Sequence, residues 1–268
     1  MLLSPTMEKL RLLKLAGMAK GLEEQQKLKS YQGLSFEERL GHLVDYEQAL
    51  RENKRLTNRL SRARLKQQAC MEDIVYPATR NLDRALVRKL STCAWIKEHH
   101  NLVITGLTGV GKSYLACALA HKACLEGYTS LYTRAPRLFG ELETAKADGR
   151  YQKVLQSFAK VDLLIIDDWG LSKLNGREER ELLEVMEDRY EVRSTIFLSQ
   201  VPVKDWHELI PNKTIADAIL DRVVHNSYRI ELSGPSMRKE KNKAVVSRRF
   251  RPTNFPAIMS YRIFHLVF

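Results

Sequence analysis

The chain has 268 residues, enough for a full α/β core with a small accessory region, and its hydrophobic and charged contents of 44% and 28% are those of an ordinary globular protein. Its 44 lysines and arginines against 32 acidic residues give a formal charge of +12. This charge predicts a polyanionic partner, with nucleic acid first and an anionic membrane surface second, and a basic protein lacking any polyanionic partner is the alternative. Because no apolar run reaches the roughly 18 residues of a membrane span, no signal-peptide core is present and the four cysteines form no zinc pattern, we expect a cytoplasmic protein with no membrane partner and reduced thiols.

Residues 1–68 carry a helical pattern and form the first predicted domain. Apolar residues between positions 10 and 22 predict one amphipathic helix. A second helix is expected to begin after Ser35, because this residue is a suitable N-cap and is followed by Glu37 and Glu38 in the first turn. The domain is therefore predicted to be all-α.

The second half of this domain is strongly basic, with Glu52 as the single acid between positions 51 and 66. Several of its basic residues follow steps of four, three and four, so one helix face would be almost entirely cationic. Stacked like charges cost stability unless an anion neutralises them, so we interpret this face as a contact for the phosphates of duplex DNA, with a plain exposed helix as the alternative. The residues assigned to DNA binding are Arg51, Arg55, Arg59, Arg62 and Lys66.

From about residue 70, short apolar strands alternate with helices, which predicts an α/β fold with a mainly parallel sheet wrapped on both faces. Strands are expected at 102–105, 129–133, 161–166, 194–198 and 228–232, and helices at 112–126 and 178–192. This second domain is placed at 69–245. The tail at 246–268 has no clear pattern and is assigned no role.

The segment Gly106-Leu107-Thr108-Gly109-Val110-Gly111-Lys112-Ser113 satisfies the phosphate-loop pattern G-x-x-x-x-G-K-[ST] in full. Its glycines let the backbone N–H groups and the following helix N-terminus point at phosphates. Lys112 is expected to reach the β- and γ-phosphates of ATP, and the Ser113 hydroxyl to contact Mg²⁺. A structural glycine-rich turn is the alternative, but the position between an apolar strand and a helix favours nucleotide binding.

Acidic and amide side chains follow two further predicted strands. Asp167 and Asp168 end the apolar strand at 161–166, where Asp167 would hold Mg²⁺ and Asp168 would act as general base toward water. Ser199 and Gln200 follow the strand at 194–198. If that strand lies between the strand at 102–105, which leads into the phosphate loop, and the strand at 161–166, one of these side chains faces the γ-phosphate. Gln200 would then orient the attacking water. A simple turn before Pro202 is the alternative.

Taken together, these residues resemble the IstB/DnaC-type AAA+ ATPases, and most closely IstB, the helper ATPase of bacterial insertion sequences. The resemblance covers roughly residues 7 to 243. Besides the phosphate loop it rests on the segments Asp167–Gly170, Asp188–Thr195, Val203–Trp206, Ile219–Arg222, Gly234–Arg238, Leu12–Met18 and the Glu47…Arg51 stretch.

The resemblance implies a AAA+ core behind an N-terminal helical domain, homo-oligomers assembled with ATP on DNA, and the transposase of the same insertion sequence as a partner. Arg222, which on pattern alone is a surface charge, then matches the arginine that acts on the neighbouring subunit's γ-phosphate, and Arg238 matches the sensor-2 position that contacts phosphate in its own subunit. Asp168 and Gln200 depart from the glutamate and asparagine that many relatives carry, which puts the rate of hydrolysis in question.

Two rival functions remain open. A DnaC-like helicase loader shares the ATPase core but grips a helicase through its N-terminal region. A nucleotide-gated DNA scaffold would bind ATP with little hydrolysis. In either case, the sequence has no helix-turn-helix or finger pattern, so DNA contact is expected to be largely independent of sequence.

Overall fold

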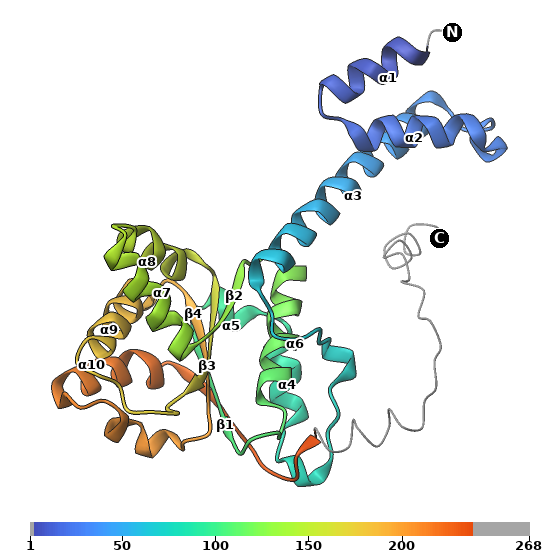
Figure 1. Ribbon diagram of the computed structural model, residues 1–268. Helices are drawn as coiled ribbons and strands as arrows, with labels where there is room; N and C mark the ends of the chain where they lie inside the picture. The colour runs from blue at the N-terminus through green and yellow to red at the C-terminus, as the bar shows by residue number, and fades with distance from the viewer. Residues whose placement is uncertain (1–2, 238–268) are drawn as a thin grey trace, which may run out of the picture.

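The computed structural model describes residues 3–237 of the chain, which form an α/β core and a helical arm that projects from it (Figure 1). Arg238, expected at the sensor-2 position, and the tail at 246–268 lie outside the described residues. Within residues 3–237, none of the helices combines the length and apolar character needed to cross a bilayer.

The core is built on one parallel sheet of five strands in the order β2-β3-β4-β1-β5. The strands are β1 (Asn101–Gly106), β2 (Ser130–Arg134), β3 (Leu163–Trp169), β4 (Ser194–Ser199) and β5 (Ser227–Leu232). Because β4 lies between β1 and β3, the carboxyl ends of these three strands meet at one edge. The predicted parallel α/β fold is confirmed. The strand before Gln200 also lies between β1 and β3, as the predicted role of Gln200 requires.

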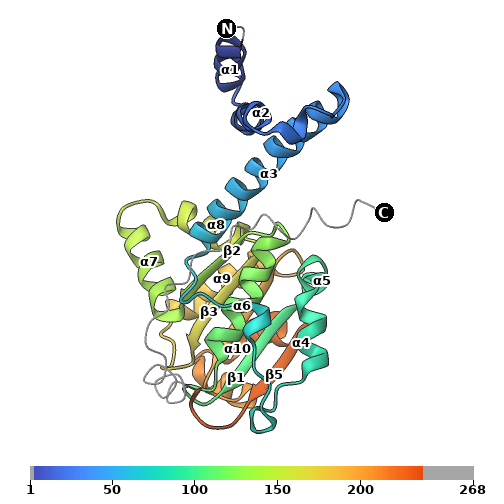
Figure 2. The ribbon, with the colours of Figure 1, turned by 90° about the vertical axis from the view of Figure 1, so that its right-hand side faces the viewer.

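Helices cover both faces of this sheet (Figure 2). The α-helices of the core are α4 (Arg84–Ser91), α5 (Ala94–Lys97), α6 (Lys112–Leu125), α7 (Ala135–Ala147), α8 (Tyr151–Lys160), α9 (Glu178–Arg189) and α10 (Lys213–Val224). Short 3-10 turns are η2 (Met71–Asp73), η3 (Ala78–Arg80) and η4 (Val203–Leu209). The sequence pattern predicts none of α4, α5, α7 and α8, and it places the end of α9 three residues too late.

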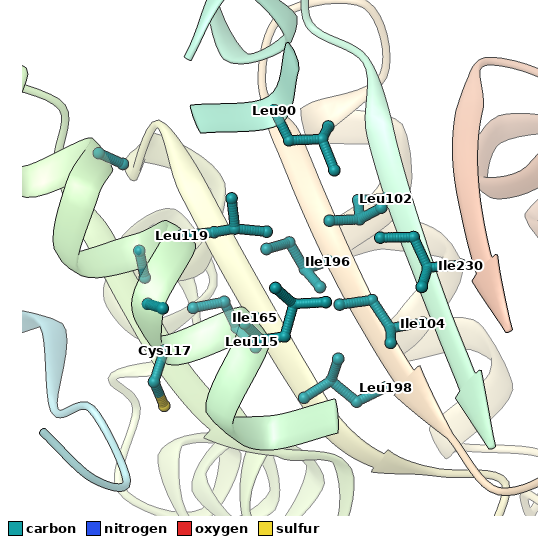
Figure 3. Close-up of a cluster of buried hydrophobic side chains, with 14 of the residues drawn as sticks. Leu90, Leu102, Ile104, Leu115, Cys117, Leu119, Ile165, Ile196, Leu198 and Ile230 are labelled. Atoms are coloured by element: carbon teal, nitrogen blue, oxygen red, sulfur yellow. The ribbon is translucent and has the colours of Figure 1, made fainter. Parts of the chain in front are cut away.

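Alternate residues of β1, β3 and β4 enter two separate apolar cores. On one face, Ile104, Ile165 and Ile196 pack against α4, α5 and α6, with Leu115 and Leu119 as the central helix contacts (Figure 3). On the other face, Val103, Ile166 and Phe197 pack against α7 to α10. Strands buried on both faces need continuous apolar runs, and this is why the runs in the sequence predicted a parallel sheet.

The arm consists of α1 (Leu3–Leu12), α2 (Ala16–Lys27), the turn η1 (Lys29–Tyr31) and α3 (Phe36–Ala63). The single helix expected across positions 10–22 is wrong, because the chain breaks at Lys14, whose φ is +60°. The start of α3 is as predicted: the Ser35 hydroxyl accepts from the Glu38 amide, and the Glu38 carboxylate accepts from the Ser35 amide.

A buried carboxylate fixes α2 on α3. Glu47 of α3 accepts from the Gly17 amide at 2.7 Å and the Met18 amide at 3.3 Å, so it caps the N-terminus of α2. Arg51 Nε lies 2.6 Å from its other oxygen. Burial alone would raise the pKa of Glu47, but these hydrogen bonds outweigh it and lower the pKa below the ordinary value. Since a Cβ on Gly17 would lie 2.5 Å from the Glu47 Cα, glycine is needed for this close packing.

Candidate nucleotide site and basic groove

The phosphate loop joins β1 to α6 and holds three glycines at positive φ, of +143°, +88° and +98° at Gly106, Gly109 and Gly111. L-residues with a side chain rarely adopt such angles, so the glycines permit the tight turn. Lys112 Nζ donates to the carbonyls of Gly106 and Leu107, at 2.5 Å and 3.0 Å. The lysine thus curls over the loop on which phosphates would lie.

A buried arginine, Arg80, supports this loop from behind. Its side chain is 3% exposed and donates to the carbonyls of Val110, Gly111 and Val75. The Met237 amide also donates to the Gly109 carbonyl at 3.0 Å, so the described chain ends against the loop.

The Ser113 hydroxyl and the Asp167 carboxylate lie together, with Ser113 Oγ donating to Asp167 Oδ2 at 2.7 Å. The Tyr132 hydroxyl also donates to Asp167 Oδ2. Burial raises the pKa of Asp167, but hydrogen bonds from Tyr132, Ser113 and Lys66 outweigh it, so the pKa stays below the ordinary value. A serine hydroxyl beside an ionised carboxylate fits the oxygen chemistry that Mg²⁺ prefers.

Lys66 also reaches this pair, although it was assigned to DNA binding. Its Nζ lies 3.1 Å from Asp167 Oδ2 and 3.5 Å from Ser113 Oγ. The interpretation that it shares one helix face with Arg55, Arg59 and Arg62 is wrong, because α3 ends at Ala63 with the next residue in the left-handed conformation.

Asp168 adopts a strained backbone, with φ at +60° and its amide donating to Asp167 Oδ1 at 2.7 Å. Its carboxylate lies 3.8 Å from Arg134 Nη1, which stands at the end of the neighbouring strand β2. Positive φ at a residue other than glycine is costly and tends to occur at functional sites. Asp168 is placed at the edge of the same cleft as the phosphate loop.

At the end of β4, Ser199 and Gln200 make different contacts, which bears on which of them faces the γ-phosphate. The Ser199 hydroxyl donates to the Trp169 carbonyl at 2.8 Å and accepts from the Val201 amide at 3.0 Å, so it is occupied in fixing the turn. Gln200 instead meets the phosphate loop, where the Thr108 hydroxyl donates to its Oε1 at 2.7 Å. Gln200 is the better placed of the two to face a bound phosphate.

These groups line one cavity of about 630 Å³. Its lining includes the carboxylates of Asp167 and Asp168, Gln200, Val75 and Met237. This cavity brings together the predicted residues Thr108, Gly109, Gly111, Lys112, Ser113, Asp167, Asp168 and Gln200.

Arg222 lies outside this cavity, on α10. Its guanidinium donates to Glu187 at 3.0 Å and to the Ala218 carbonyl at 2.8 Å, and it lies over the Tyr190 ring. The Arg222 carbonyl accepts a hydrogen bond from the Asn101 side chain, at the first residue of β1. The phosphate loop begins at Gly106, the last residue of the same strand. The six residues of β1 span roughly 17 Å, so Arg222 is remote from the phosphates of its own subunit.

A second cavity, of about 1420 Å³, is a basic groove between α3, α7, α8 and the edge strand β2. The lower end of α3 meets the core beside β2 (Figure 2), where Arg59 Nε donates to the Cys124 carbonyl at 2.9 Å. Among the residues that line the groove, Glu141 is the single acid. The basic residues that line it are Arg55, Arg59, Arg62, Arg64, Arg137, Arg150 and Lys160.

The groove gathers three of the five residues assigned to DNA and leaves two outside. Arg55, Arg59 and Arg62 line it. Arg51 pairs with Glu47 in the arm, and Lys66 reaches into the nucleotide cavity. The cationic surface predicted from α3 alone is therefore both shorter than expected and wider, because α7 and α8 supply its other wall.

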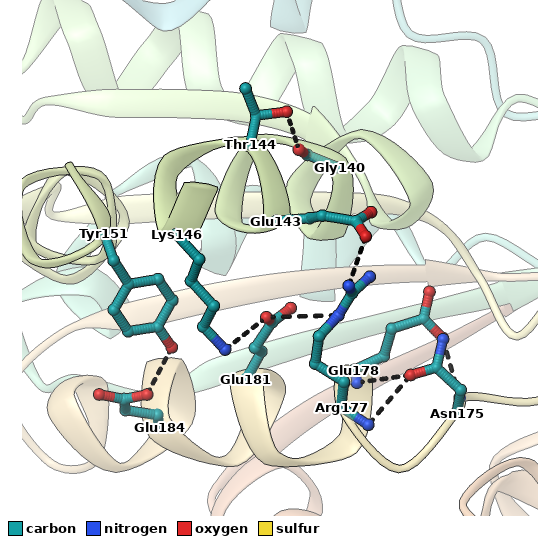
Figure 4. Close-up of polar contacts among 10 residues, drawn as sticks. All are labelled: Gly140, Glu143, Thr144, Lys146, Tyr151, Asn175, Arg177, Glu178, Glu181 and Glu184. Atoms are coloured by element: carbon teal, nitrogen blue, oxygen red, sulfur yellow. Dashed lines mark hydrogen bonds and ion pairs between the residues drawn. The ribbon is translucent and has the colours of Figure 1, made fainter. Parts of the chain in front are cut away.

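A polar network holds that wall against α9 (Figure 4). Lys146 of α7 lies 2.8 Å from Glu181, a carboxylate that is 1% exposed. Arg177 bridges Glu143 of α7 and Glu181, and Tyr151 donates to Glu184 at 2.6 Å. These contacts tie α7 and α8 to the helix that follows the Asp167–Asp168 strand.

Sequence reasoning missed Arg80, Tyr132 and Arg134. No motif points to Arg80, which reaches the loop only through the tertiary fold. Tyr132 and Arg134 had a signal: β2 pairs with β3 so that Arg134 stands opposite Asp167, and alternate residues of a strand share a face. Knowing that pairing would have placed both near the carboxylates.

Comparison with known proteins agrees with this architecture. Residues 8–245 match the family described as IstB-like ATP binding protein. A protein of Sinorhizobium fredii named as an insertion-sequence ATP-binding protein is 50% identical over 243 residues, covering 91% of this chain and 99% of its own. The crystal structure of DnaI is 25% identical with a TM-score of 0.53, covering 62% of this chain and 92% of that one. The DnaC helicase loader, at 21% identity and a TM-score of 0.52, covers 62% and 97% and shares the fold.

Proposed function

This chain belongs to the IstB-like ATP-binding proteins, and from that premise we propose that it is an AAA+ ATPase that assembles on duplex DNA and assists the transposase of an insertion sequence. The observation that carries the proposal is the basic groove, which lies against the same sheet whose carboxyl edge holds the phosphate loop. The named relatives support the link to insertion sequences.

In the proposed reaction, ATP binds along the phosphate loop. Lys112 stabilises charge on the β- and γ-phosphates, and the N–H groups at the start of α6 face the same oxygens. Ser113 and Asp167 would hold Mg²⁺, which supplies charge neutralisation when bound. Gln200 orients the attacking water and Asp168 accepts its proton.

Arg222 completes the site of a neighbouring subunit in this proposal. Its distance from its own phosphate loop supports action in trans, and so does its side-chain exposure of 26% on the surface of α10. Arginines in this role raise hydrolysis by about 10³–10⁵. Hydrolysis is therefore coupled to assembly.

Phosphate release at saturating duplex DNA tests this mechanism. We expect Lys112→Ala and Arg222→Ala each to lower the rate, with Arg222→Ala about 10³-fold slower but still able to bind ATP. An equal mixture of the two variants should regain about one quarter of wild-type activity, since Lys112→Ala subunits donate Arg222 to sites on Arg222→Ala subunits. Equal background rates for wild type and both variants would refute hydrolysis and leave the nucleotide-gated scaffold.

The groove favours duplex DNA over the single strands that a helicase loader would prefer. Proteins that hold single strands stack bases on exposed aromatic rings, whereas Phe158, the one aromatic residue in the groove lining, is 1% exposed. Seven cations line the groove, of which Arg64 and Arg137 pair with Glu141 and Arg150 pairs with Asp148. Contacts from such cations to phosphates need no base stacking. Binding of labelled duplex and single strands, with and without ATP, separates the two functions, and a preference for single strands would favour the loader.

A further inference from the structure

The ammonium group of Lys66 rests on the oxygens proposed to hold Mg²⁺. Its Nζ lies 3.1 Å from Asp167 Oδ2 and 3.5 Å from Ser113 Oγ. The Asp167 side chain is 4% exposed and the Lys66 side chain 38%. A cation that reaches in from the surface thus neutralises a buried carboxylate.

Asp167 Oδ2 accepts from three donors, namely Ser113, Tyr132 and Lys66. A carboxylate oxygen offers about two lone-pair sites, so a metal ion that approaches it must replace a donor. Tyr132 is a buried, neutral phenol, and Ser113 is itself a metal ligand in the proposed site. Lys66 is the charged member of the three, and Mg²⁺ at this oxygen would repel it.

Lys66 is also tied to the helix that lines the groove. It follows Ala63, the last residue of α3, by three positions, and Ala63 is fully buried. Between them, Arg64 turns the chain at a φ of +50° and lies 3.6 Å from Glu141 of α7. Lys66 and one wall of the groove are therefore joined by a segment of three residues.

We propose that Lys66 and Mg²⁺ compete for the Asp167 carboxylate, so that a magnesium nucleotide frees the segment 64–67 and changes the affinity of the groove for DNA. This inference rests on the proposed function and has two parts that can be tested separately. The first is competition at the nucleotide site, and the second is coupling to DNA binding in the groove. Because linkage is reciprocal, DNA in the groove changes metal affinity by the same factor.

The competition is tested by counting free Mn²⁺, used in place of Mg²⁺, by electron paramagnetic resonance in the presence of a non-hydrolysable ATP analogue. Lys66→Gln keeps a hydrogen-bond donor without the charge and should bind Mn²⁺ about 5- to 30-fold more tightly than wild type. Lys66→Arg should stay near wild type. Lys97→Gln, an exposed lysine on α5 that lines neither cavity, is the matched control and should be unchanged.

Equal or weaker Mn²⁺ binding by Lys66→Gln overturns the competition. So does weaker binding of the analogue by Lys66→Gln in EDTA, because that result would make Lys66 a direct phosphate ligand. Neither measurement involves DNA.

The coupling is tested by fluorescence anisotropy of labelled duplex DNA with and without the Mg²⁺–analogue complex. In wild type the two affinities should differ, and in Lys66→Gln the ratio between them should fall at least threefold toward one. An unchanged ratio overturns the coupling. Absence of duplex binding in every state refutes the proposed function itself, while the Mn²⁺ result stands separately.

Discussion

The nucleotide cavity and the basic groove are built in different ways. Most of the nucleotide cavity comes from the ends of three adjacent strands, and the phosphate loop is one continuous segment whose glycine angles and lysine follow from eight consecutive residues. The groove joins α3 to α7 and α8, which stand about 80 residues further along the chain. A continuous motif carries its geometry with it, whereas a surface assembled from distant segments exists only after the fold has formed.

Reversing the α3 wall of the groove should give the largest effect. We expect the double variant Arg55→Glu/Arg62→Glu to weaken duplex binding about 100- to 1,000-fold, because two phosphate contacts are lost and two repulsions added, and to leave ATP binding within twofold. The measurement is duplex anisotropy beside titration with a fluorescent ATP analogue. Lys54→Glu, on α3 but outside the groove lining, is the control and should lose far less. An equal loss in the control would remove the distinction between groove and general charge.

Reversing the α8 wall tests the part of the groove that the sequence did not predict. Lys160→Glu should weaken duplex binding about 10- to 30-fold and lower the dependence of log affinity on log salt by about 0.9. Lys153→Glu lies on the same helix outside the lining and serves as the control. If Lys160→Glu binds like wild type while the α3 variant fails, DNA touches one wall only, and the prediction from α3 was sufficient.

Adding a methyl group at Gly109 tests whether nucleotide binding requires the backbone conformation of the phosphate loop. A Cβ there would lie 2.1 Å from Ser236 Oγ at a φ of +88°, so we expect Gly109→Ala to weaken ATP-analogue binding about 10-fold and to leave DNA binding intact. Gly41→Ala on α3 meets nothing within 4 Å and should stabilise its helix slightly. Unaltered nucleotide binding by Gly109→Ala would mean that the loop can give way.

A pH dependence of stability is expected at Asp167. Hydrogen bonds from Tyr132, Ser113 and Lys66 outweigh burial and lower its pKa in the folded chain, so the folded state favours the ionised form. Its contribution is then fully present above the unfolded pKa, near 4, and is lost as pH falls through the folded pKa. In urea unfolding, wild type should exceed Asp167→Asn by about 1–3 kcal/mol at neutral pH, with the gap narrowing below pH about 4. A gap that is constant with pH would contradict this assignment.

The sequence was sufficient where local rules decide the outcome. Apolar runs predicted the five parallel strands, and the N-cap residue Ser35 predicted the start of α3. The pattern G-x-x-x-x-G-K-[ST] predicted the phosphate loop. It failed where tertiary contacts decide: Lys14 breaks the first helix, and Lys66 turns away from α3 into the nucleotide cavity. Arg80 illustrates the same limit, because a buried cation under the loop carries no local pattern.

The position of Arg222 near the amino end of β1, opposite the phosphate loop, has an arithmetic consequence. When each subunit lends its arginine to the next, an open row of n subunits contains n − 1 complete sites, whereas a closed ring contains n. In such an open row, the one member without a complete site would keep its ATP, while the other members would hydrolyse theirs. Such a row would carry a nucleotide cap at one end, so its lifetime on DNA would be set at that end and its turnover per subunit would report its length.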